Sequence, residues 1–194
     1  MAKRTTFFHV YGLALALPMV SSLSTVGAAA DNTTVPPALT TSAGQPAPIE
    51  TKAYVDQAAA ADLFEIESSK LAQQKSKNTQ VQAFAKMMIH DHAASTAKLK
   101  TILKAGRMDE PPSTLPPDLQ TQLDGLKAQS GETFDAAYVK AQLEGHQAAL
   151  QLHQSYAATG TDKKLRAFAA QTAKVVQKHL DHVQMLAKKL NIAA

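Results

Sequence analysis

Apolar residues recur at helical spacing along most of the chain after residue 50, which is typical of helices with one buried face. No proline occurs between Pro48 and Pro111, and none after Pro117. Because proline is excluded from helix interiors, these two proline-free stretches can hold long helices. Each stretch divides once, near Asn78 and near Gly160. The pattern therefore predicts four long helices, over about residues 53–76, 79–105, 133–158 and 162–191.

Capping residues support these limits. Asn78 and Asp162 stand where helix N-caps are expected, and Gly106 is expected as the C′ residue that ends the second long helix. The two caps also open a weak internal repeat, because residues 78–85 and 162–169 both end in Ala-Phe-Ala. The proline-rich segment 109–117 would cross over and lead into a short helix at about residues 118–128. Two helical hairpins joined in this way predict an all-α, four-helix bundle with ferritin-like connectivity.

The N-terminus carries a different pattern. Lys3 and Arg4 precede an apolar stretch over residues 7–26, and three alanines end at Ala30. This order is typical of a secretory signal peptide, predicted over residues 1–30. A retained membrane anchor is the alternative, but polar interruptions leave the apolar run too short to span a bilayer easily. Residues 31–50, rich in Pro, Thr and Ala, are predicted to be a disordered tether before a domain at residues 51–194. A periplasmic or secreted location follows from this interpretation.

Composition narrows the choice of partners. The chain has 194 residues, 20 basic and 16 acidic, for a net charge of +4, and it contains no cysteine. Cleavage after Ala30 would remove two basic residues and no acidic one, leaving +2. The lysines form no dense stripe, so no nucleic-acid partner is expected, nor is a stable membrane span after processing. The lack of cysteine excludes disulfides, a cysteine nucleophile and thiolate metal sites. A homo-oligomer and other partners stay open.

The seven histidines are the unusual polar feature of the chain. At about 100° of rotation per helical residue, His92 lies at the centre of its apolar stripe, whereas His90 points away. His179 lies within the stripe of the last helix, with His182 on its flank. His146 and His153 lie at the edge of the third stripe. Gly145 costs roughly 1 kcal/mol in a helix relative to alanine, which indicates a close neighbour beside His146.

The first long helix adds carboxylates to this set. Asp62 lies on its apolar face, with Glu65 beside it. Each helix therefore offers a ligand-type side chain near its middle, and helical bundles build metal centres in this way. A satisfied core histidine is the alternative interpretation at each position. A ferritin-type di-iron centre is not favoured, because the glutamates expected three residues before His92, His146 and His179 are replaced by Ile89, Leu143 and Val176.

Four strings in this sequence resemble one family. They are residues 62–72 (DLFEIESSKLA), 84–92 (FAKMMIHDH), 134–138 (FDAAY) leading to His146, and 165–169 (LRAFA) leading to His179. The chain is similar in these strings to an uncharacterised family of exported bacterial ferritin-like proteins, often labelled as membrane or outer-membrane proteins. The resemblance covers about residues 53–190. It implies a four-helix fold, an extracytoplasmic location and recurrent polar positions at Glu65, Asp91, His92, His146 and His179, but no activity.

Together these observations favour a metal-binding protein of the bacterial envelope. Its expected ligands are Glu65, His92, His146 and His179, and Asp62, Asp91, His153 and His182 would support or extend the site. Imidazole and carboxylate ligands suit Zn, Fe, Cu or Ni. The alternative is a metal-free interaction or stress-related structural module with a buried histidine network. Whether the protein is an enzyme stays open, because no catalytic residues can be assigned from the sequence.

Overall fold

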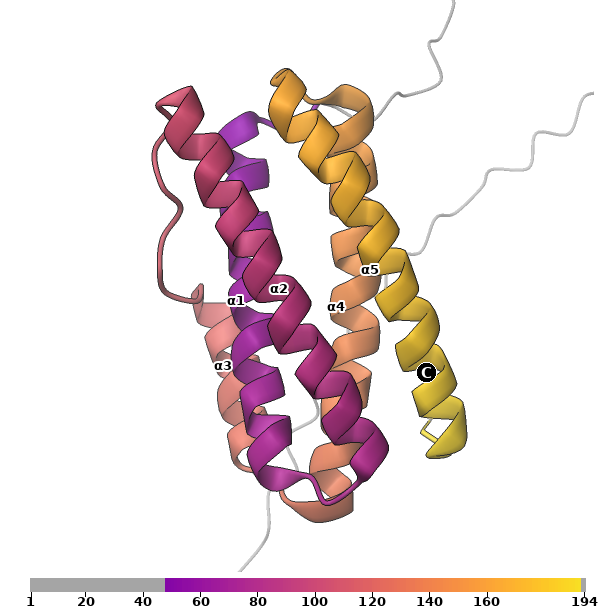
Figure 1. The fold of residues 1–194 in the computed structure, drawn as a ribbon. Helices are drawn as coiled ribbons and strands as arrows, with labels where there is room; N and C mark the ends of the chain where they lie inside the picture. Colours follow the sequence, from indigo (N-terminus) through magenta and orange to yellow (C-terminus); the bar gives the residue numbers. More distant parts are fainter. Residues whose placement is uncertain (1–47, 193–194) are drawn as a thin grey trace, which may run out of the picture. The chain divides into compact units, whose positions relative to one another are not determined.

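A computed structural model describes residues 48–192, which form five helices and no strand (Figure 1). The helices are α1 (Thr51–Lys75), α2 (Thr79–Gly106), α3 (Pro117–Lys127), α4 (Gly131–Thr159) and α5 (Lys163–Lys189). The prediction of an all-α fold is confirmed, and each predicted helix is present with ends displaced by a few residues. The predicted signal peptide (residues 1–30) and nearly all of the predicted tether (31–50) lie outside the described residues.

The helix N-termini follow the predicted caps. The Asn78 side chain accepts hydrogen bonds from the backbone N–H groups of Gln80 and Val81 at the start of α2. Asp162 accepts one from Leu165 at the start of α5. Each cap satisfies backbone donors that have no partner within the helix.

The predicted C′ residue of α2 is wrong by one position. Gly106 is the last helical residue, and Arg107 takes the left-handed conformation with φ 54°. Arg107 N–H bonds the carbonyl of Lys104, and Met108 N–H bonds that of Leu103, which is the Schellman pattern. Met108 also packs beside Leu103 on an apolar cluster. With the C′ position at Arg107, Met108 packs against the apolar cluster. This position is used although glycine adopts the left-handed conformation more easily than arginine.

The long helices pack as two hairpins. α1 lies against α2, and α4 lies against α5; these are the most extensive contacts among the described helices (Figure 1). Between the hairpins, α1 contacts α4, and α2 contacts α5. The short helix α3 packs against α1 and α4. Each long helix therefore has two long neighbours, and side chains from all four can meet in the interior.

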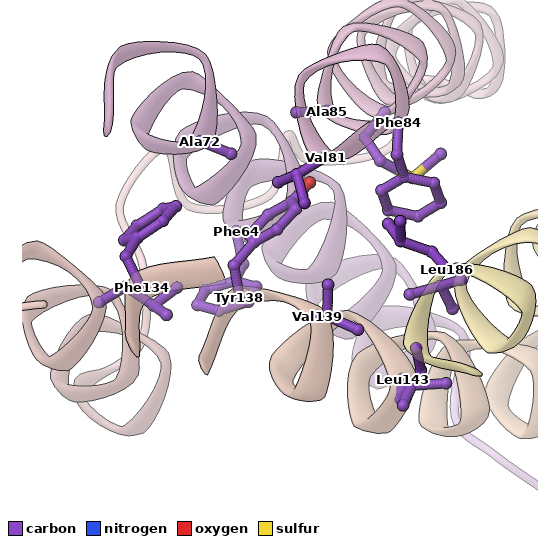
Figure 2. Close-up of a cluster of buried hydrophobic side chains, with 14 of the residues drawn as sticks. Phe64, Ala72, Val81, Phe84, Ala85, Phe134, Tyr138, Val139, Leu143 and Leu186 are labelled. Carbon is purple, nitrogen blue, oxygen red and sulfur yellow. The ribbon is translucent and has the colours of Figure 1, made fainter. Parts of the chain in front are cut away.

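The interior holds two apolar clusters. Figure 2 shows one of them, in which side chains such as Phe64, Phe84, Tyr138 and Leu186 converge from four helices. The second cluster includes Tyr54, Leu99, Tyr156 and Phe168. On each long helix the two clusters occupy different segments, and buried polar residues lie between or next to them.

This polar layer interrupts an otherwise apolar core. It contains buried carboxylates on α1 and buried histidines on α2, α4 and α5: Asp62, Glu65, His92, His146, His153 and His179. Burying such groups costs free energy unless they are paired, so packing alone does not explain the layer. Among residues 48–192, no helix is both long enough and apolar enough to cross a membrane.

Candidate metal centre

Three histidines from three helices meet in the polar layer. His92 of α2, His146 of α4 and His179 of α5 have ring centroids 5.4–5.7 Å apart. Each can offer one nitrogen such that all three nitrogens lie within 4.8 Å of one another. The side chains are almost fully buried, with exposed fractions of 5%, 1% and 3%. We call these three residues the histidine cluster.

The ring nitrogen that does not face the cluster is held by an acceptor in every case. His92 Nδ1 is 2.8 Å from Asp62 Oδ1, and His146 Nδ1 is 2.8 Å from the backbone carbonyl of Gln142. His179 Nε2 is 2.9 Å from Asp91 Oδ2. Because a carbonyl and an ionised carboxylate can only accept, the histidine nitrogen at each contact is the protonated one.

In the neutral form of each imidazole, the opposite nitrogen is then the lone-pair donor. His92 Nε2, His146 Nε2 and His179 Nδ1 are buried and have no hydrogen-bond partner. Metal-binding histidines have this arrangement, because a carboxylate or carbonyl on the far nitrogen fixes the tautomer and the ring orientation. Three imidazoles oriented in this way could hold one cation.

Glu65 lies next to the cluster but outside the group of three. Its Oε1 is 3.7 Å from His146 Nδ1, and its Oε2 is buried without a partner. Burial raises the pKa of Glu65 to about 7, and the nearby His92 and Gln142 side chains oppose this rise. Gly145 faces the same carboxylate, since a Cβ built there would lie 3.0 Å from Glu65 Oε1.

The three imidazoles differ in their preference for a proton. Burial, together with the neighbouring His92, lowers the pKa of His146 to about 4. Burial also lowers the pKa of His179 to about 4, although its hydrogen bond to Asp91 opposes the change. Burial acts in the same direction on His92, but the hydrogen bond to Asp62 and the charge of Glu65 outweigh it, so the pKa of His92 is raised. Of the three imidazoles, His92 therefore has the highest pKa in the metal-free protein.

Of the remaining histidines and carboxylates, some contact the histidine cluster and others do not. Asp62 and Asp91 contact cluster histidines, as described above. His153 is buried but pairs with Tyr54, whose hydroxyl is 3.0 Å from His153 Nδ1. His182 is exposed and packs edge-on against Phe84. His90 is exposed, as its helical position predicts, and contacts Asp91.

Two hydrogen-bond partners of the buried histidines are not among the residues predicted from the sequence. The carbonyl of Gln142 orients His146, and its position four residues earlier on the same helix was the available signal. Tyr54, the partner of His153, lies on a different helix hairpin, and no spacing in the sequence points to it.

The described fold is similar to that of a solved structure. The chain is similar to the crystal structure described as "putative secreted protein DUF305 from Streptomyces coelicolor", with a TM-score of 0.62 and 11% sequence identity. The alignment covers 73% of this chain and 94% of that chain. At this identity the similarity shows a shared helical fold alone.

Sequence comparison assigns the family. No curated protein sequence matches the chain at a significant level. The family described as "Domain of unknown function (DUF4142)" matches residues 36–186. The expectation of an uncharacterised family is thereby confirmed. Since the match spans most of the chain, the chain belongs to the DUF4142 family.

Proposed function

We propose that the protein binds one divalent metal ion at the histidine cluster. The ligands would be His92 Nε2, His146 Nε2 and His179 Nδ1, with Glu65 as the carboxylate ligand. Two observations carry this proposal: the three histidines can each offer a nitrogen within 4.8 Å of the other two, and each has one buried ring nitrogen without a hydrogen-bond partner. Three neutral imidazoles and one carboxylate form a ligand set found in zinc and other transition-metal sites.

A purely structural histidine network fits these contacts less well. Buried polar atoms in native proteins are nearly always hydrogen-bonded, and leaving one unpaired costs about 1–3 kcal/mol. Here three such nitrogens lie together, beside the unpartnered Glu65 Oε2. A single cation between the imidazoles would account for the three nitrogens, and a shift of the Glu65 carboxylate toward it would satisfy the fourth atom. No second function is favoured by a comparable observation, because Val175 and Met185 are the only exposed large hydrophobic residues in the described part of the chain.

The charges near the cluster suit a divalent cation. Asp62 and Asp91 lie behind two of the imidazoles, and Glu65 lies beside the third. Three carboxylates near one buried position compensate a double positive charge, which would otherwise be costly to bury. With nitrogen and oxygen ligands, the candidate metals are Zn, Fe, Cu and Ni.

The setting of this function is inferred from the sequence pattern and the fold. We propose that the long helices form a ferritin-like four-helix bundle, supported by the order of two hairpins and a crossover. Export to the periplasm or the exterior is supported by the basic and apolar N-terminal pattern. A solved structure of similar fold that is described as secreted agrees with it. The task would be to bind or buffer a metal outside the cytoplasm.

Elemental analysis of the tag-free protein tests the proposal. Wild-type protein loaded with zinc and then desalted should retain about one equivalent. The double variant His92→Ala/His179→Ala should retain far less, because it lacks two of the three imidazoles. The matched control is His90→Ala/His182→Ala, which removes two exposed histidines from the same helices and should retain the wild-type amount. Substoichiometric metal in the wild type, or equal metal in both double variants, would overturn the proposal.

A further inference from the structure

A groove between α2 and α5 opens beside the histidine cluster. It has a volume of about 310 Å³, and His92 and His179 are among the residues that line it. A second groove, of about 320 Å³, is lined by residues of α1, α3 and α4, including Glu65 and Gly145 but none of the cluster histidines. Of these two grooves, only the α2–α5 groove borders the imidazoles of the cluster.

The free polar groups of the α2–α5 groove can all donate hydrogen bonds. Ser95 Oγ is buried without a partner, and Lys98 places its ammonium group at the exposed rim. Lys98 donates to the side-chain oxygen of Gln171 across the groove, which leaves the Gln171 amide N–H₂ group free to donate. The one carboxylate that lines the groove is already engaged, since the two oxygens of Asp91 contact His90 and His179.

The second groove has a more acidic lining than the α2–α5 groove, in which Lys98 balances Asp91. It is lined by the carboxylates of Glu65 and Asp118 and by no basic residue. An anion would consequently be repelled there and attracted by Lys98 in the α2–α5 groove.

We propose that the α2–α5 groove binds a small monoanion, such as a short carboxylate, with one acceptor atom beside His92 and His179. This inference rests on the proposed function, because the bound metal supplies the positive charge at the inner end of the groove. Ser95 and Lys98 would hold the outer part of the anion. Phe168 and Val176, which also line the groove, would contact a short alkyl chain. The metal, held by the three imidazoles and Glu65, would then take the anion as a fifth ligand.

Cobalt(II) provides a probe for this site, because its visible absorption changes with coordination. The full chain, without a tag, is loaded with cobalt and titrated with azide and with acetate. Saturable spectral changes are expected for both anions. In Lys98→Gln the anions should bind about two- to fivefold more weakly, which is the effect of one partly exposed charge.

Two matched variants identify the groove. Ala94→Phe places a ring in the α2–α5 groove, and Ala148→Phe places the same ring in the second groove; both positions are exposed. We expect Ala94→Phe to keep about one equivalent of cobalt and to lose the response to anions. Ala148→Phe should keep both. Val175→Phe, at an exposed position that lines the α2–α5 groove, replaces Ala94→Phe if that variant loses cobalt.

The outcomes separate the two proposals. If wild-type protein binds no stoichiometric cobalt, the proposed function fails, and this inference fails with it. If cobalt binds but neither anion changes the spectrum, only the inference is overturned. The same conclusion holds if Ala94→Phe and Val175→Phe leave the anion response intact, or if Ala148→Phe removes it.

Discussion

Gly145 on α4 leaves room for the carboxylate of Glu65 on α1, because a Cβ at Gly145 would lie 3.0 Å from Glu65 Oε1. This contact is tighter than an ordinary van der Waals contact, so a side chain at this position would displace the carboxylate. A mid-helix glycine lowers helix stability, by roughly 1 kcal/mol relative to alanine. The glycine lies next to His146, and the lower helix stability is offset by the space it leaves for Glu65 beside the cluster.

Gly145→Ala should therefore weaken metal binding without stabilising the protein. The gain in helix propensity, roughly 1 kcal/mol, would be offset by the displacement of the buried Glu65 carboxylate. Gly125→Ala on α3 is the control, because nothing lies within 4 Å of a Cβ there. It should raise the free energy of unfolding in urea and leave zinc affinity unchanged. Equal stabilisation by both substitutions, with equal zinc affinity, would contradict the role assigned to Gly145.

Asp91→Asn should lower zinc affinity about 10- to 100-fold, which is the usual effect of losing a carboxylate behind a metal-binding histidine. The reason is that Asp91 holds His179 Nε2 at 2.9 Å and so fixes the orientation of His179 Nδ1. Zinc affinity measured by competition with a chelating dye tests this. Asp181→Asn, which changes an exposed residue of α5, is the matched control. Equal affinities in the two variants would show that Asp91 has no part in positioning the imidazole.

Most of the fold could be predicted because single residues, prolines and helix caps, mark most of the helix ends. Prolines bound the first long helical stretch and precede the second, and Asn78 and Asp162 cap the helices that they begin. The end of α2 was misplaced by one residue, because conformational preference points to Gly106 whereas the packing of Met108 depends on contacts that are not local. Helix ends that depend on tertiary packing are not visible in a local pattern.

The candidate site could be predicted only in part. Helical rotation separates the buried His92 from the exposed His90, because both lie on one helix. It could not separate His146 from His153, which lie two turns apart on the same edge of α4 and are both buried. Only the relative positions of the helices bring His146 to the cluster and His153 to Tyr54. The same positions pair Asp91 with His179 rather than with the adjacent His92.

Tyr54→Phe should destabilise the protein and leave the metal content unchanged. The substitution removes the hydroxyl that is 3.0 Å from His153 Nδ1, and an unpaired buried polar atom costs about 1–3 kcal/mol. Tyr156→Phe is a suitable control, since its hydroxyl contacts Thr51 in a partly buried position and should matter less. Urea unfolding and zinc content check both expectations. A fall in zinc content in Tyr54→Phe would instead connect His153 with the metal centre.

The metal-free protein should lose stability as the pH falls from about 6.5 to 4. Burial lowers the pKa values of His146, His153 and His179 to about 4, so in this range the unfolded chain binds more protons than the native one. Glu65 acts in the opposite direction, because its pKa is raised to about 7 and the native state keeps its proton. Three histidines outweigh one carboxylate, and the net effect is destabilisation by acid.

His153→Gln isolates one of these contributions, because His153 lies outside the cluster. Its plot of unfolding free energy against pH should be less steep than that of the wild type between pH 4 and 6.5. The difference should not exceed about 1.4 kcal/mol per pH unit, the value for a single proton. Urea titrations of the chelator-treated proteins at several pH values measure both slopes. Identical slopes would show that His153 is not neutral in the native state at acidic pH.

The central claim is that one metal ion lies between the three imidazoles. The most direct measurement is a crystal structure of the tag-free protein with one equivalent of zinc, with anomalous data collected at the zinc edge. The account predicts a single strong peak about 2.0–2.1 Å from His92 Nε2, His146 Nε2 and His179 Nδ1. A structure with no peak in the cluster, or with zinc bound only at exposed residues such as His90 or His182, would contradict it.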